Sequence, residues 1–542
     1  MKARTFLGLV AATAIPIACS SSQSGTADTA VASGGSGEGG ALGVGGTWGG
    51  SGGDTGIDAA GTGTGATGGV PGAGGRERTD GAQGTGGRVG TDGATGGTTS
   101  TDGRGGTTGS GGTTSTGGRG GTTGKGGTTA SGGGPGGAAG SGGIVGSGGS
   151  TPGIDGGTAT NLCEGLVQDK EKHPMTALAK PAALAFVTDA EFGTKIYRVS
   201  EVKASGSSDA VIKPMYSTIS AWNADESMLL LYDVAAGHQL YDGKTYAFLR
   251  NLDISPADLE QVYWDTSDPD ILYYVDGKKF IRYHVGKSQA ETLTTFSFCA
   301  DSASGGSDPM FTSFDSARIG LGCGDQAFIY DIKANTVVAR KTNTDDNPAQ
   351  IAPSGTLAYF SDSGRVTDEG LNVLRTLDLV EPWGHASMGR LPTGEDTWNG
   401  AVYDDGPKGN TDIGSVVTFD LTTGKSRVII GPKTGYPYPP TTHISALAYR
   451  QPGWVVASTV GDTSGAGLLD LEVLVANTAT GTVCRVGRHR SWGKENTKLQ
   501  ESYWAEAHAV PSPSGTRIAF GSDWGNGTTV DTYVVELPSY VR

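Results

Sequence analysis

Two histidines in the C-terminal half of the chain are the residues best suited to chemistry. His443 follows an aromatic and proline-rich loop that contains Tyr436 and Tyr438, and His508 lies two residues after Glu506. Residues two apart in an extended strand point to the same face, so Glu506 and His508 should share one. Imidazole nitrogens and a carboxylate oxygen suit zinc or a transition metal. The pattern makes His443, Glu506 and His508 candidate ligands of a divalent metal, although a lone histidine is more often a hydrogen-bonded structural residue.

Aromatic and basic residues form a second set of candidates. Five basic residues between positions 485 and 498 surround Trp492, in a domain that is otherwise acidic. Arginine pairs with carboxylates and tryptophan stacks on sugars or cations, so this loop either contacts an anionic ligand or is simply solvated. The residues that the ligand-binding hypothesis assigns are Trp222, Trp264, Trp398, Tyr436, Tyr438, Arg488, Arg490, Trp492 and Trp504.

The sequence contains none of the compact catalytic motifs. There is no GxSxG elbow, no HExxH pair, no phosphate-binding loop with a Lys-Ser/Thr ending and no EF-hand loop. Catalytic residues therefore stay unassigned, and whether the protein is an enzyme stays open. No cofactor is expected beyond the candidate divalent metal. The favoured hypothesis is a propeller that binds a partner without catalysis.

The elements that must position these residues form a repeating unit of short strands. A polar turn at 512–515 precedes the apolar run 516–523, and a turn at 352–355 precedes 357–362 in the same way. Similar units recur about every 40–60 residues, a period typical of β-propellers. Seven turn copies predict an all-β, seven-bladed propeller, with six or eight blades and a pair of stacked sandwiches as alternatives. Segments 183–187 and 195–199 precede the first turn and should pair with the last blade to close the ring.

The run from Ser512 to Asp523 resembles the repeat of TolB-like, WD40-like propellers, in which an SPDG turn precedes an apolar strand and Ser-Asp. Members of this group include partner-binding scaffolds, peptidase accessory domains and polysaccharide lyases. The chain also loosely resembles the oligogalacturonate lyase propellers, whose metal is held by several histidines and a glutamine. That resemblance implies metal ligation by His443 and His508, with Glu506 as a further oxygen ligand. The chain departs from the family near the last turn, where a His-x-His pair is expected and only one histidine is present. The alternative function is therefore a polysaccharide lyase acting on uronate-containing glycans.

The first nineteen residues are typical of an export signal. Lys2 and Arg4 precede a short apolar stretch that is too short to span a bilayer as a helix. The sequence Ile-Ala-Cys-Ser around Cys19 resembles a bacterial lipobox, which implies a lipid on Cys19 and sorting of the protein to the outer membrane or cell surface. The alternative is an ordinary secretory signal and a secreted protein.

Composition divides the rest of the chain in two. The chain has 542 residues and 94 glycines, which are concentrated in residues 20–159. Such a segment cannot bury enough apolar surface to fold, so we expect a disordered tether before a propeller domain at 160–542. The net charge of −15 argues against binding nucleic acid or an anionic lipid surface. The expected partner of this monomeric domain is a protein or an extracellular or envelope glycan, with membrane contact only through the lipid.

Four cysteines remain after Cys19, an even number that favours disulfides in an exported chain. Three pairings are open. Cys299 and Cys323 are 24 residues apart and should lie in neighbouring strands, which favours that pair and leaves Cys163 with Cys484.

Overall fold

The computed structural model describes the C-terminal part of the chain. The described residues are 161–202, 210–342, 344, 346, 348–379, 385–402, 415–437, 441–499 and 502–542. The predicted signal peptide, Cys19 and the predicted tether lie outside them.

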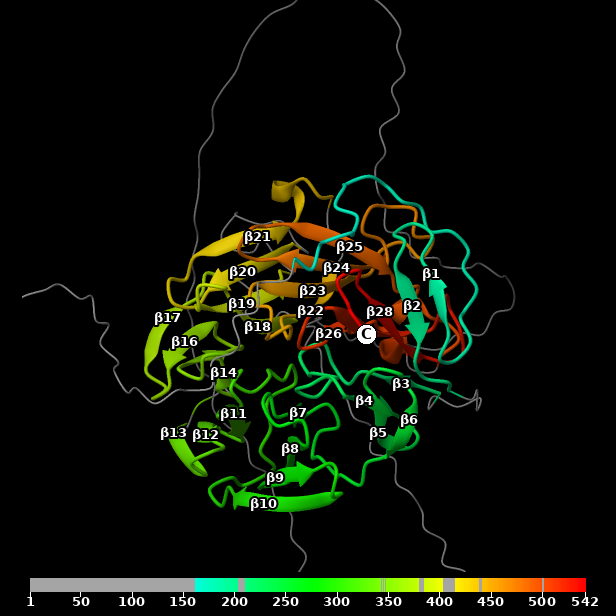
Figure 1. The fold of residues 1–542 in the computed structure, drawn as a ribbon. Coiled ribbons are helices and arrows are strands. Elements are labelled where there is room, and N and C mark those ends of the chain that lie inside the picture. The colour runs from blue at the N-terminus through cyan, green and yellow to red at the C-terminus, as the bar shows by residue number, and fades with distance from the viewer. Residues whose placement is uncertain are drawn as a thin grey trace, which may run out of the picture. The chain divides into compact units, whose positions relative to one another are not determined.

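Seven antiparallel sheets form the blades of a β-propeller (Figure 1). The first two blades contain β3 (Ile212–Lys213), β4 (Met228–Asp233), β5 (Gly237–Asp242), β6 (Phe248–Asn251), β7 (Val262–Trp264), β8 (Ile271–Asp276), β9 (Lys279–His284) and β10 (Gln289–Thr295). The next two contain β11 (Arg318–Cys323), β12 (Gln326–Asp331), β13 (Thr336–Lys341), β14 (Gln350–Ile351), β15 (Leu357–Phe360), β16 (Arg365–Asp368) and β17 (Val373–Thr376).

The fifth and sixth blades contain β18 (Ala386–Arg390), β19 (Asp396–Ala401), β20 (Val416–Asp420), β21 (Ser426–Ile430), β22 (Thr441–Ser445), β23 (Trp454–Thr459), β24 (Glu472–Asn477) and β25 (Val483–Arg488). The seventh contains β26 (Val510–Pro511), β27 (Arg517–Ser522), β28 (Asp531–Glu536), β1 (Phe186–Thr188) and β2 (Lys195–Arg198). The predicted all-β propeller with seven blades is confirmed, and the stacked-sandwich alternative is wrong.

Strands from both ends of the described chain close the ring. The strand order in the seventh blade is β1-β2-β28-β27-β26, and β2 pairs antiparallel with β28 from Lys195–Glu536 to Arg198–Tyr533. The prediction that the first segments join the last blade is therefore confirmed. This pairing joins strands from both ends of the described chain in one sheet, so neither β2 nor β28 is left as an unpaired edge.

The repeated turn has a clear physical basis. Gly515 has φ +73°, and its N–H donates to the Ser512 carbonyl oxygen at 2.7 Å; Gly355 has φ +74° and donates to Ala352 at 2.8 Å. A left-handed residue at this position favours glycine. Strand β27, which follows the turn at 512–515, is buried at all six positions because side chains on both of its faces pack within the propeller.

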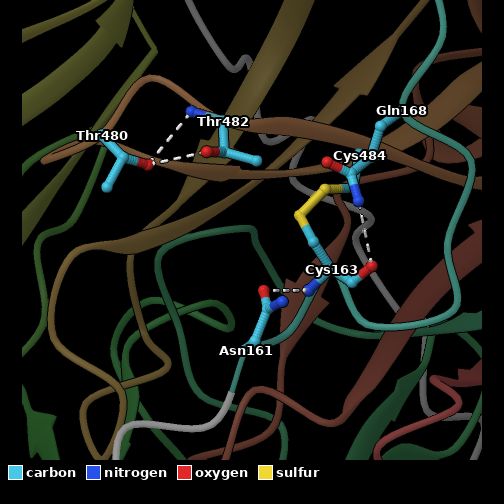
Figure 2. The surroundings of a disulfide bond; sticks show 6 residues. All are labelled: Asn161, Cys163, Gln168, Thr480, Thr482 and Cys484. Carbon is cyan, nitrogen blue, oxygen red and sulfur yellow. Dashed lines mark hydrogen bonds between the residues drawn. A yellow bond between two sulfur atoms is a disulfide. The ribbon is translucent and has the colours of Figure 1, made fainter.

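The segment from 161 to 180 is fastened to the sixth blade by a disulfide between Cys163 and Cys484 in β25 (Figure 2). The Cys163 N–H donates to Asn161 Oδ1 at 3.1 Å, and Gln168 Nε2 donates to the Cys163 carbonyl oxygen at 3.5 Å. A second disulfide joins Cys299 to Cys323. These are the two pairs that the cysteine spacing favours.

Helix is limited to three short 3-10 turns in the described chain: η1 (Pro432–Thr434), η2 (Gly493–Glu495) and η3 (Ser502–Ala505). No helix among the described residues has the length and apolar character needed to cross a bilayer.

Candidate metal site between the last two blades

His443 and His508 come from neighbouring blades and meet where their inner strands begin. His443 lies in β22 and His508 two residues before β26. Their ring centroids are 4.1 Å apart. Glu506 lies beside both rings, with Oε2 at 3.8 Å from His443 Nδ1 and 3.6 Å from His508 Nε2. One ligand atom from each of the three residues falls within 4.8 Å of the other two, a spacing that a single cation could bridge.

The backbone that brings Glu506 and His508 together is a turn and not a strand. The 3-10 turn η3 ends at Ala505, and the Glu506 N–H donates to the Tyr503 carbonyl oxygen at 2.9 Å. His508 has φ +44°, a left-handed conformation that is unusual for a residue with a side chain. The expectation of an extended segment here is therefore wrong, although the two side chains do converge.

The three side chains are buried, and most of the imidazole nitrogens among them lack a hydrogen-bond partner. His443 is 1% exposed, His508 is not exposed and Glu506 is 5% exposed. Within the described part of the chain, neither ring nitrogen of His443 has a hydrogen-bond partner, nor does Nε2 of His508. Buried polar atoms are almost always paired, so three unpartnered nitrogens around a carboxylate need an explanation. A divalent cation would supply one, and on this ground the residues fit a metal.

Burial also sets the protonation of the two rings. Loss of water, and then the proximity of His508 and His385, holds the pKa of His443 well below its usual range. Burial, followed by the nearby Lys213 ammonium, does the same for His508. Both imidazoles are therefore neutral, which is the state in which a ring nitrogen can bind a metal.

A second polar group, which the sequence analysis missed, adjoins the trio. His385 lies one residue before β18, and its ring centroid is 4.5 Å from that of His443. Its Nδ1 is 2.7 Å from the Tyr216 hydroxyl, which donates its own proton to Asp308. The side chain of His385 is 36% exposed, so this ring is the solvent-accessible member of the group. Its place just before an inner strand, shared with His508, is the signal that could have identified it.

Lys213 approaches the trio from β3 in the first blade. Its Nζ lies 2.8 Å from His508 Nδ1 and donates to the Glu506 carbonyl oxygen at 3.0 Å. The side chain is fully buried, and loss of water lowers the pKa of Lys213 to about 8. The site is thus built from the first, fifth, sixth and seventh blades, which only ring closure brings together.

Several residues predicted to bind a ligand are instead part of the core. Trp222, Trp264 and Trp398 are each at most 1% exposed, so none can offer a face to a sugar. Tyr436 is also buried, and its ring lies under the Lys170 ammonium at 4.7 Å. The hypothesis is wrong for these four residues, while Tyr438 lies outside the described residues.

The arginines of the predicted basic loop are likewise internal, and Arg488 is the last residue of β25 rather than a loop residue. Arg488 is fully buried and donates to the carbonyl oxygens of Asp470 and His173. Arg490, 5% exposed, donates to the Thr176 carbonyl oxygen at 2.7 Å. Both guanidinium groups are engaged by internal partners and hold the segment that precedes β1, which contradicts their assignment as ligand-binding residues.

The remaining two aromatic candidates are partly buried. The Trp492 N–H donates to the Asp523 carboxylate at 3.1 Å, and Trp504 packs against Tyr232 with ring centroids 6.3 Å apart. Their role in ligand binding stays a prediction.

Comparison with solved structures finds many chains of similar fold, including two oligogalacturonate lyases. No family model matches the chain, and no curated protein matches it by sequence. A solved oligogalacturonate lyase in complex with manganese has a TM-score of 0.48 and 17% identity, covering 69% of this chain and 99% of its own. An oligogalacturonate lyase from Vibrio parahaemolyticus has a TM-score of 0.48 and 14% identity, covering 66% of this chain and 97% of its own. At these identities the likeness concerns the fold alone, which the sheet topology already establishes.

Proposed function

We propose that this protein is a metal-dependent enzyme that cleaves a uronate-containing glycan by β-elimination. The observation that carries the proposal is the buried trio of His443, Glu506 and His508, whose imidazole nitrogens lack partners and whose candidate ligand atoms lie within 4.8 Å. A divalent cation held there would act as a Lewis acid toward a substrate carboxylate.

His385 is the residue placed to move the proton. Burial raises the pKa of Tyr216 well above its usual range, so its hydroxyl stays protonated. That hydroxyl donates to Asp308 and therefore accepts a hydrogen bond from Nδ1–H of His385. This arrangement assigns the Nδ1 proton to the tyrosine contact, and we propose Nε2 as the general base.

The chemistry of a uronate matches this arrangement. Removal of the proton on the carbon next to the carboxylate sends an electron pair into a new carbon–carbon double bond. The glycosidic oxygen on the following carbon then leaves and takes a proton from solvent, and His385 keeps the abstracted proton. A base beside a site that neutralises the carboxylate is what this reaction requires, and it explains why no motif for a nucleophile is needed.

The experiment combines Mn²⁺ titration calorimetry with a product assay. We expect the purified protein to bind Mn²⁺, and H443A and H508A to weaken binding at least about 100-fold, since loss of even an outer-shell partner costs about 10–100-fold. H385A should bind Mn²⁺ normally but release no unsaturated product from oligogalacturonate. H284A, which removes a partly exposed histidine in β9, is the matched control and should behave as wild type.

The two outcomes that would change the proposal are distinct. Failure of the wild-type protein to bind Mn²⁺ would remove it. Binding of Mn²⁺ and of oligogalacturonate without any product would instead show a glycan-binding propeller, the non-catalytic function that the sequence favoured.

We also propose, from the sequence around Cys19, that the domain is tethered by lipid to the outer membrane or cell surface.

A further inference from the structure

The basic cluster at 485–498 spans the end of β25 and the segment that leads to β26, and it retains two exposed lysines. Among its five basic residues, Arg485, Arg488 and Arg490 are buried with internal partners, whereas Lys494 and Lys498 are exposed. Of the two lysines, Lys494 forms an ion pair with the metal trio in the described structure: its Nζ lies 3.3 Å from Glu506 Oε1. Its side chain is 74% exposed, while that of Glu506 is 5% exposed.

The backbone under Lys494 is held by hydrogen bonds, although the side chain itself is largely exposed. Lys494 lies in η2, whose flanking N–H of Trp492 and side-chain amide of Asn496 both donate to the buried Asp523 carboxylate, at 3.1 and 2.6 Å. A methyl group added at Gly493 would lie 3.6 Å from Glu506 Cγ, so the turn runs directly over Glu506. A fixed turn with a long, exposed ammonium at its tip stands at the solvent side of the trio.

We infer that Lys494 is the residue that recognises the substrate carboxylate, and that it occupies Glu506 only until a divalent cation binds there. This inference rests on the proposed function of the same site. The ammonium and the cation compete for one carboxylate, because Oε1 of Glu506 faces the lysine while Oε2 faces the two imidazoles. A cation bound at Glu506 would repel the Lys494 ammonium and would leave its flexible side chain directed toward solvent.

The released ammonium lies where a negatively charged sugar must arrive. The trio itself is buried, so a ligand must approach it past the exposed groups beside it. Among these, Lys494 is the cation, and His385 and the partly exposed Asp308 are the titratable groups. Lysine is a mobile point charge with three donors and can follow a carboxylate without a fixed geometry. The site would therefore select glycans by their charge as well as by the metal.

The test separates metal binding from substrate binding in the full mature chain. K494Q should bind Mn²⁺ more tightly, by about threefold to tenfold, because a positive charge near the cation is removed in a partly solvated setting. The same variant should raise KM for tri-galacturonate about tenfold or more, yet leave binding of its methyl ester unchanged. K494R should restore most of the affinity for the acidic sugar, and K498Q is the matched control for loss of charge from the same loop.

The results distinguish the inference from the function on which it rests. Equal Mn²⁺ affinity in wild type and K494Q, or equal losses for the acid and its methyl ester, would overturn the role of Lys494 and leave the metal site standing. Absence of Mn²⁺ binding in the wild type would overturn both.

Discussion

The disulfide between Cys163 and Cys484 should contribute more to the free energy of unfolding than the disulfide between Cys299 and Cys323. It joins residues 321 apart and fastens the N-terminal segment to the sixth blade, whereas Cys299 and Cys323 are only 24 apart. A crosslink stabilises mainly by restricting the unfolded chain, and the effect grows with the logarithm of the loop. That relation gives about 6 kcal/mol for the long loop and about 3.5 kcal/mol for the short one. We therefore expect C163A/C484A to lose about 2 kcal/mol more than C299A/C323A.

Alanine is the appropriate replacement in both variants. Cys163 and Cys484 are 1% and 0% exposed and belong to an apolar cluster, so serine would bury an unpaired hydroxyl and add its own cost. Cys299 and Cys323 are similarly buried, at 2% and 4%, so the loss of sulfur packing is matched between the two variants. The difference in stability then reports the loop length and not the packing.

The assay is urea denaturation of both variants and the wild type without reductant, followed by intrinsic tryptophan fluorescence. Reduced wild type serves as a further control and should resemble a variant that lacks both bonds. If C163A/C484A loses no more than C299A/C323A, the N-terminal segment detaches before the ring opens, and the loop-entropy reasoning is refuted for this protein.

Three further predictions concern other parts of the chain. Burial, and then the adjacent Glu191, raises the pKa of Asp189 to about 6 from 3.8. A carboxyl whose pKa is higher in the folded state binds more protons there, so wild-type stability should fall as the pH rises from about 4 to 7, relative to D189N, in denaturation measured at each pH. Replacing Cys19 with serine should release the protein from the membrane fraction, and retention of C19S in the outer membrane would contradict the lipid anchor. Deleting residues 34–157 should leave the melting temperature unchanged, because a segment with so few apolar residues has no core to contribute; a drop of several degrees would show that it packs on the propeller.

The fold could be predicted from local signals because the same turn-and-strand pattern recurs several times along the chain. Polar turns such as 512–515 and 352–355 require a left-handed glycine, and each is followed by an apolar strand that can be recognised in the sequence. The number of such copies therefore gives the number of blades. Even ring closure followed from an excess of strands before the first turn. These features depend on residues within about ten positions of one another, which a single sequence displays.

The aromatic candidates failed for a reason that is also local. Trp222, Trp264 and Trp398 lie at or near inner strands, where a residue can face either the neighbouring blade or the solvent. Alternation with period two separates the two faces of a strand but does not say which face is covered, and in a propeller both faces of most strands are buried. The same holds for Arg488 and Arg490, each of which donates to a backbone carbonyl more than 300 residues earlier in the chain. Charge alone could not distinguish a ligand contact from an internal clamp.

The metal trio shows how far position within a repeat can carry a functional argument. His443 and His508 could be paired because neighbouring blades place the starts of their inner strands side by side, and the structure does bring the two rings within 4.1 Å. The same rule applied to the fifth blade points to His385, which lies one residue before β18 and completes the row of three imidazoles. What the rule could not supply is the orientation of each ring, since that depends on a left-handed His508, on the turn that ends at Ala505 and on Lys213 arriving from the first blade. Residue position in a repeat therefore predicts which side chains lie close together. The irregular loops between repeats determine how those side chains are oriented, and so which chemistry they can perform.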